Sequence, residues 1–168
     1  MAALWSASRV ASRVERQTAE QASLLLLAEA QRVLQCVARV HECGYAHCDL
    51  KPEHFMRFPP GGEIKLVDFG CAWPLGSYVT PGHTRRYCAP ELASSMLQRR
   101  RLRVEAGLDI WAAGLVLYEL FCGRPLHAEG VSYAEVALSM TPSLRRDGAA
   151  NAAELTDAHA RLLASVLR

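Results

Sequence analysis

The sequence predicts a mainly α-helical domain that carries one small β-hairpin. Three observations indicate this fold class. The first 43 residues contain neither glycine nor proline, the spacing of apolar residues changes between residues 54 and 67, and residues 108–122 are apolar on nearly every helical face. The chain has 168 residues, which is enough for one domain with a hydrophobic core, so we treat residues 1–168 as a single domain.

The N-terminal segment has apolar residues at helical spacing, which predicts an amphipathic surface helix. These residues are Leu4, Ala7, Ala11 and Val14. The segment is also rich in Arg, Ser and Ala, with no acid before Glu15, a composition that organelle transit peptides share. We favour the surface helix.

A second helix is predicted from the capping box Thr18-Ala-Glu-Gln21 to Gly44, a residue type that commonly ends helices. Its apolar stripe consists of Leu26, Ala30, Val33, Val37 and Val40. The runs 54–58 and 63–67 then alternate as strands do, and Pro59-Pro60-Gly61-Gly62 between them favours a hairpin.

The second half of the chain is predicted to be helical after an irregular stretch at 71–91 that proline and glycine interrupt. The apolar helix at 108–122 is expected at the centre of the domain. A capping box at Ser132-Tyr-Ala-Glu135 opens a short helix to about Met140, and Thr156–Leu167 forms a last amphipathic helix.

Composition excludes several classes of protein. The net charge of +2 gives no reason to expect a nucleic-acid partner, and no apolar run is long enough to predict a membrane span. The six cysteines are scattered without a CxxC pair, which favours reduced thiols in the cytoplasm, with the nucleus as an alternative.

Four motifs follow one another in an order that identifies a family. The segment His47-Cys48-Asp49-Leu50-Lys51-Pro52-Glu53 resembles the catalytic loop of protein kinases, and Asp68-Phe69-Gly70 resembles their magnesium-binding motif. Ala89-Pro90-Glu91 and the helix from Asp109 to Leu120 resemble the next two family features. The resemblance runs from about residue 4 to the C-terminus, which is why we favour a surface helix over a transit peptide.

This resemblance implies ATP-dependent phosphorylation of serine or threonine in a protein substrate, with magnesium as the metal. Asp49 would accept or orient the proton of the attacking hydroxyl, and Lys51 would hold the γ-phosphate. Asp68 would bind the magnesium, and Met56 would lie under the adenine. Thr84 matches the threonine that contacts the catalytic aspartate and lysine in the family.

Other matching residues are expected to have structural roles. His47 should lie in the core against Phe69, and Asp109 should hold the backbone of the catalytic loop. Glu91 matches the glutamate that pairs with an arginine in the family, and the sequence stops before that arginine. Cys71 is interpreted as a small core residue, with a reactive thiol as the alternative. A zinc site built from His47, Cys48 and His54 is disfavoured because their spacing matches no zinc motif.

Two residues depart from the family pattern. His54 stands where the family has the asparagine that binds a second magnesium, so His54 could still serve as a metal ligand, but with weaker magnesium binding or a preference for manganese. Cys48 stands where an arginine usually pairs with a phosphate on the activation segment. Phosphorylation of that segment would therefore not act through residue 48; its candidate hydroxyls are Ser77, Tyr78, Thr80 and Thr84.

The sequence has no glycine before Gly44 and no lysine before Lys51, so it contains neither the glycine-rich loop nor the strand lysine of a kinase small lobe. We therefore expect the large, C-terminal lobe alone, without its extreme C-terminal helix and without activity by itself. The cleft face with Phe69 and Met56 would then be open to a partner protein.

Two other functions remain open. A pseudokinase-like interaction module would use the fold for binding only. A small-molecule phosphotransferase of the aminoglycoside type ranks last, because Lys51 and the Ala-Pro-Glu motif are both present.

Overall fold

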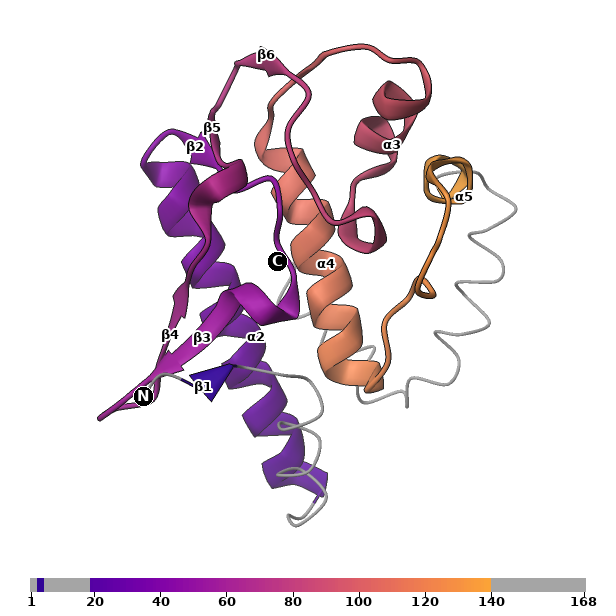
Figure 1. Ribbon diagram of the computed structural model, residues 1–168. Coiled ribbons are helices and arrows are strands. Elements are labelled where there is room, and N and C mark those ends of the chain that lie inside the picture. Colours follow the sequence, from indigo (N-terminus) through magenta and orange to yellow (C-terminus); the bar gives the residue numbers. More distant parts are fainter. Residues whose placement is uncertain (1–2, 5–18, 140–168) are drawn as a thin grey trace.

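The computed structural model describes residues 3–4 and 19–139. Two long helices, α2 (Ala19–Glu42) and α4 (Ala106–Cys122), run side by side in opposite directions through the molecule (Figure 1). The short helices α3 (Pro90–Leu97) and α5 (Tyr133–Leu138) pack against each other near the start of α4. The fold class predicted from the sequence, mainly α-helical with a small β-hairpin, is confirmed.

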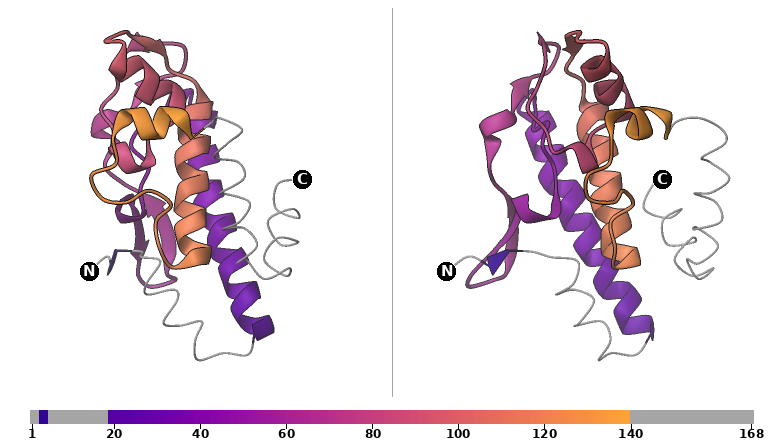
Figure 2. Two further views of the ribbon diagram at one scale, coloured as in Figure 1. Left: turned by 90° about the vertical axis from the view of Figure 1, so that its right-hand side faces the viewer. Right: turned by 45° about the vertical axis from the view of Figure 1, so that its right-hand side comes forward.

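The predicted hairpin forms between β3 (Phe55–Phe58) and β4 (Glu63–Leu66), with Phe55 opposite Leu66. A third strand, β1 (Ala3–Leu4), pairs antiparallel with β3 and widens the hairpin into a sheet. The prediction that Leu4 belongs to an N-terminal surface helix is therefore wrong, and the other residues of that predicted face lie outside the described residues. The three strands form the edge of the molecule beside α2 (Figure 2).

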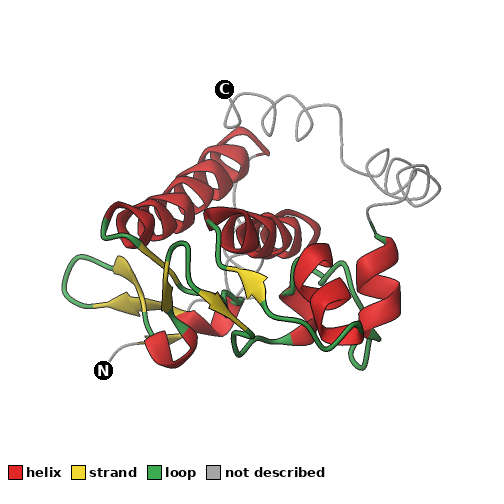
Figure 3. Ribbon diagram, turned by 90° about the horizontal axis from the view of Figure 1, so that it is seen from above, coloured by secondary structure: helices red, strands yellow, loops and turns green. Residues whose placement is uncertain are grey.

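The stretch that we expected to be irregular contains short ordered elements. Strand β2 (Tyr45–Ala46) pairs with β5 (Trp73–Pro74), and β6 (Tyr78–Val79) pairs with β7 (Leu102–Arg103). Three short 3-10 helices, η1 (Pro52–His54), η2 (Phe69–Cys71) and η3 (Arg85–Tyr87), lie between them. These two strand pairs join loops that are distant in the sequence, and they lie on the side of the molecule that Figure 3 shows.

The hydrophobic core lies where α2, the β3–β4 hairpin and α4 meet. Four of the five predicted stripe residues of α2 are buried there, and the fifth, Val40, is partly buried. A second cluster joins α3, α5 and the first turns of α4. Gly44 follows α2 with φ of 81°, a conformation that strongly favours glycine, as the sequence predicted for the end of this helix.

Helix α4 is less enclosed than the sequence predicted. Leu108, Leu115 and Leu120 are buried, but Ile110 is 64% exposed and Gly114 lies on the same exposed side. The capping box of Ser132 and Glu135 is present, and its helix ends at Leu138. The predicted box at Thr18 and the predicted helix 156–167 lie outside the described residues. No helix in the described part of the chain has the length and apolar character needed to cross a membrane.

Candidate active site

The loop that follows β2 is anchored to helix α4 by the carboxylate of Asp109. This side chain is fully buried on α4, and it accepts hydrogen bonds from the backbone N–H groups of His47 at 2.7 Å and Cys48 at 2.8 Å. The Nε2 atom of His41 lies 2.9 Å from the same carboxylate. Cys48 has φ of 66°, a conformation uncommon outside glycine, so the loop turns sharply at this anchored point. Asp109 thus fixes the loop backbone, as we expected.

His47 connects this loop to the segment after the hairpin. It is fully buried, its Nε2 lies 3.1 Å from the carbonyl oxygen of Val67, and its Nδ1 accepts the N–H of Asp49 at 3.3 Å. These partners assign the proton to Nε2. Its ring centroid lies 5.0 Å from that of Phe69, which is the contact that the sequence led us to expect. Burial lowers the pKa of His47, so its ring is neutral at pH 7.

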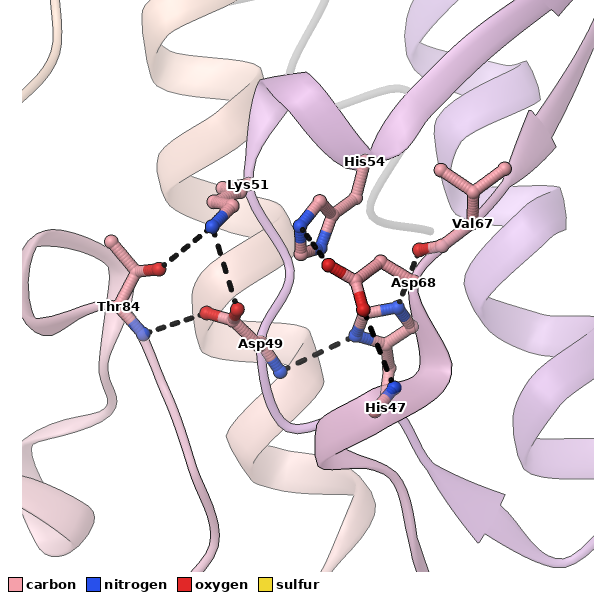
Figure 4. A network of polar contacts seen from close by, with 8 residues as sticks. His47, Asp49, Lys51, His54, Val67, Asp68 and Thr84 are labelled. Carbon is pink, nitrogen blue, oxygen red and sulfur yellow. Dashed lines mark hydrogen bonds and ion pairs between the residues drawn. The ribbon is translucent and has the colours of Figure 1, made fainter.

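Asp49, Lys51 and Thr84 form the centre of the site (Figure 4). The Oδ1 atom of Asp49 accepts the backbone N–H of Thr84 at 2.6 Å, and its Oδ2 lies 3.5 Å from Nζ of Lys51. Nζ of Lys51 also donates to Oγ1 of Thr84 at 3.2 Å. Burial raises the pKa of Asp49, but the hydrogen bonds from Thr84 and the charge of Lys51 outweigh it and lower that pKa overall. The Asp49 carboxylate is therefore ionised and oriented by a residue 35 positions away.

Asp68 and His54 form the second polar pair. The Oδ2 atom of Asp68 lies 3.3 Å from Nε2 of His54, and the two side chains face each other in Figure 4. The Asp68 side chain is 65% exposed, whereas the His54 side chain is almost fully buried, and its Nδ1 has no hydrogen-bond partner among the described residues. Asp68 adopts a left-handed conformation with φ of 64°, and its carboxylate accepts the N–H of Gly70 at 3.4 Å. A carboxylate thus stands at the open face of the site.

The remaining predicted residues surround this centre without joining it. Met56 is partly buried on β3, and Phe69 is 49% exposed. Glu91 is exposed in the first turn of α3, with no ion pair to any residue within 19–139. Cys71 is only partly buried and belongs to neither core cluster, so its interpretation as a core residue is wrong. Burial and the nearby Asp49 raise the pKa of its thiol, which does not favour a reactive cysteine either.

A groove of about 700 Å³ opens beside Lys51 and Thr84. Its lining comes from residues 51–54 in the loop after β2, from residues 83–87, and from a far wall at residues 129–133 that reaches the first residue of α5. Tyr133 on that far wall contacts both Arg85, whose guanidinium lies 4.5 Å from the ring centre, and His83, whose Nε2 is 3.0 Å from the tyrosine hydroxyl. Lys51 and Thr84, which both contact Asp49, line this groove, so it opens next to the residues that hold the Asp49 carboxylate.

Two supports of the site were not anticipated from the sequence. His41 lies 68 residues before Asp109, and only its position in the last turn of a helix could have suggested a polar contact. Tyr87 donates its hydroxyl to Glu119 at 2.8 Å and thereby connects η3 to α4. Burial, together with that carboxylate, raises the pKa of Tyr87, so the phenol stays protonated. The available signal for Glu119 was that an acidic residue lies near the end of a mostly apolar helix.

Comparison with known proteins gives one consistent result. The protein kinase domain family matches residues 9–166. Citron Rho-interacting kinase of Mus musculus is 38% identical over 125 residues, which cover 72% of this chain and 6% of that protein. Maternal embryonic leucine zipper kinase of Xenopus laevis is 34% identical over 114 residues, 65% of this chain and 16% of that protein.

A cyclin-dependent kinase and a solved complex extend the comparison. Cyclin-dependent kinase F-3 of Oryza sativa subsp. japonica is 38% identical over 102 residues, 59% of this chain and 22% of that protein. A chain of the CAK complex of Chaetomium thermophilum, solved bound to ATP-gamma-S, superposes with a TM-score of 0.58 at 25% identity; the match covers 68% of this chain and 35% of that one. The match therefore spans less than a quarter of each of these curated relatives.

Proposed function

This chain belongs to the protein kinase family, and from that premise we propose that it provides the substrate-side half of a serine/threonine kinase active site. The observation that carries the proposal is the geometry of Asp49. One of its oxygens is held by the N–H of Thr84 and the other faces Lys51, and these two partners both line the groove. A carboxylate held in this way is suited to position a hydroxyl group for attack.

The proposed reaction is phosphoryl transfer from ATP to a serine or threonine side chain. The substrate hydroxyl passes its proton to Oδ2 of Asp49 as its oxygen bonds to the γ-phosphorus and the bond from that phosphorus to ADP breaks. The lowered pKa keeps Asp49 ionised at pH 7, so it can accept a hydrogen bond from the incoming hydroxyl. Lys51 neutralises charge on the transferred phosphoryl group, and its bond to Thr84 holds it in place.

The residues present fit a divalent cation, with Asp68 as its principal ligand. Magnesium is commonly bound through one or two carboxylates together with substrate phosphates, and Asp68 offers an exposed carboxylate on the open face. His54 adds a nitrogen donor beside it, which suits manganese better than magnesium. When bound, such a cation would neutralise phosphate charge; we propose that either metal serves and that manganese is preferred.

We further propose that ATP is enclosed only when a small kinase lobe or a partner protein covers the cleft face. Phe69 and Tyr45 are 49% and 48% exposed, and together with Val40 and Ala72 they line a mostly apolar cavity of about 500 Å³. Such a surface favours a protein contact. These 168 residues alone are therefore expected to be inactive. The six free thiols suit a reducing compartment, which we propose to be the cytoplasm.

The test compares two forms of the protein in a radiolabelled ATP assay with a basic protein substrate. The chain alone should give no transfer above background, whereas the chain fused to a small lobe from one of its relatives should be active. Asp49→Asn and Lys51→Met should each lower the rate of the fusion by about a hundredfold or more. Lys65→Met is the matched control, because Lys65 is the other lysine of the chain and is exposed on β4.

A pseudokinase-like interaction module is the second candidate, and the contact between His54 and Asp68 favours it. An imidazole that already faces the metal-binding carboxylate competes with the cation. On this alternative, the fusion would stay inactive with manganese as well as magnesium, and Asp68→Asn would leave partner binding unchanged. If the fusion transfers phosphate and Asp49→Asn abolishes the transfer, the chain is part of an active kinase and the interaction-module alternative is wrong.

A further inference from the structure

The groove beside Lys51 contains an arginine whose side chain is held in place. Arg85 lines the groove, and its guanidinium lies 4.5 Å from the ring centre of Tyr133. The same guanidinium donates a hydrogen bond to the carbonyl oxygen of Val131 at 3.2 Å. Two contacts of different kinds therefore fix the position of a planar cation, so little conformational freedom is left to lose when it binds an anion.

Tyr133 is itself anchored to the segment that carries Arg85. Nε2 of His83 lies 3.0 Å from the Tyr133 hydroxyl, and Nδ1 of His83 lies 3.0 Å from the carbonyl oxygen of Pro81. Because a carbonyl oxygen only accepts, Nδ1 carries the proton, and Nε2 of the neutral ring accepts the hydrogen bond that the tyrosine donates. The aromatic ring beside Arg85 thus has a fixed orientation.

Arg85 directly follows the residue that orients Asp49. The backbone N–H of Thr84 donates to Oδ1 of Asp49 at 2.6 Å, and its Oγ1 accepts a hydrogen bond from Lys51 (Figure 4). Consecutive Cα atoms lie about 3.8 Å apart, so the backbone of Arg85 begins next to this centre. On the proposed function, a hydroxyl placed at Asp49 brings the neighbouring residues of its peptide into the groove that Arg85 lines.

The described residues do not neutralise this arginine. Arg85 is exposed, and neither it nor Arg86, which also lines the groove, forms an ion pair within residues 19–139. The carboxylates of Glu53 and Glu129 line the same groove without pairing with either arginine. The arginines can therefore attract a single acidic side chain, whereas a longer acidic run would also be repelled by the two glutamates.

We propose that Arg85 selects substrates in which one aspartate or glutamate lies next to the target serine or threonine. A guanidinium has five N–H donors in a planar fork, and within the described part of the chain Arg85 donates one hydrogen bond. It therefore keeps donors for both oxygens of a carboxylate. Tyr133 is a positioning residue that holds the fork. The inference rests on the proposed function for the place of the target hydroxyl, but not for the binding of a carboxylate to Arg85.

The experiment titrates the chain with four short peptides that share one serine, while NMR follows the Nε–Hε resonance of Arg85. Two peptides have a glutamate directly before or directly after the serine, a third has that glutamate at its far end, and in the fourth a lysine replaces it. One of the first two should bind about fivefold tighter than the third and shift the Arg85 resonance most. High salt should reduce this difference. The first three peptides have equal charge, so the difference reports the position of the acid.

Matched variants identify the receptor. Arg85→Gln should remove the preference, and Arg101→Gln, which changes an exposed arginine outside the groove, should retain it. Tyr133→Leu should weaken the preference because the guanidinium loses its aromatic contact, and Tyr133→Phe should keep most of it because the ring remains.

Three outcomes would overturn the proposal: equal affinity for all four peptides, no binding of any peptide at millimolar concentrations, or a preference that persists in Arg85→Gln. No step of the titration requires phosphate transfer. An inactive fusion protein would therefore contradict the proposed function without changing the result for Arg85.

Discussion

Asp109 on α4 holds the loop after β2 at His47, whose backbone nitrogen lies 2.7 Å from the aspartate Oδ2 atom. The same carboxylate binds the next N–H through its other oxygen, so two consecutive peptide groups are tied to the central helix. The loop therefore depends for its shape on a helix that begins more than fifty residues later.

We predict that Asp109→Asn destabilises the protein by about 3 kcal/mol, because one carboxylate oxygen becomes an NH₂ group that faces a backbone donor in a fully buried site. Urea unfolding followed by circular dichroism measures the change. Glu105→Gln, an exposed acid at the start of the same helix, should change stability by less than about 0.5 kcal/mol. Equal effects of the two substitutions would mean that the buried contact does not hold the loop.

The pKa of Asp49 is predicted to depend on Lys51. Because the folded-state pKa lies below the unfolded value of about 3.9, this carboxylate stabilises the fold above that pH, and the contribution is lost as the pH falls through the folded value. Lys51→Met should raise the pKa of Asp49, since burial would then be opposed only by the hydrogen bonds from Thr84 and the weaker influence of His54. Carbon-13 NMR titration of the aspartate carboxyl groups reads this out.

Lys65→Met is the control for the Asp49 titration. Lys65 is paired with Glu63 at 3.5 Å on an exposed strand, away from the site. This variant should leave the Asp49 titration unchanged. An Asp49 titration that does not move in Lys51→Met would show that the charge of Lys51 does not lower the pKa of this carboxylate.

Local elements were predictable from the sequence because each is fixed by neighbours along the chain. The helix 19–42 follows from its apolar spacing and its final glycine, and the hairpin follows from two short alternating runs around the Pro-Pro-Gly-Gly turn. The resemblance to protein kinases supplied the roles of the site residues. Spacing alone would not have placed His47 against Phe69.

Contacts between distant segments were not predictable in this way. Strands of two residues, such as β1, β5 and β7, are too short to show alternation, and their partners lie up to 54 residues away. Glu29 is buried on the core side of α2, where its carboxylate binds Arg57 on β3 at 2.5 Å and Arg32 at 2.8 Å. Charged residues are rarely buried without partners, and a single sequence does not show that partners exist.

His47 is predicted to make the protein less stable at mildly acidic pH. Burial lowers its folded-state pKa below the unfolded value of about 6.5, so the unfolded chain binds a proton first. The contribution of neutral His47 to stability is therefore fully present above about pH 6.5, and it is lost as the pH falls from there through the folded-state pKa. Urea midpoints at pH 7.5 and 5.5 measure this loss.

His47→Phe should reduce the pH dependence of stability while keeping the ring contact with Phe69. It should also cost about 1–3 kcal/mol at pH 7.5, because the carbonyl of Val67 and the N–H of Asp49 lose their partner. Burial also lowers the pKa of His127, so His127→Leu shows how much of the slope belongs to that second histidine. A slope that is unchanged in His47→Phe would contradict the assignment.

The six cysteines are predicted to react with iodoacetamide in a definite order. Burial raises the pKa of both Cys48 and Cys88 to about 12, so at pH 8 only about one in ten thousand of these groups is thiolate, and both are shielded from solvent. Cys43 is exposed at the end of α2 and should be alkylated first. Peptide mass spectrometry over a time course gives the order, and in 8 M urea all six should react at similar rates. Early alkylation of Cys48 in the native protein would mean that the loop after β2 opens readily, which is incompatible with an anchor at Asp109 that stays bound.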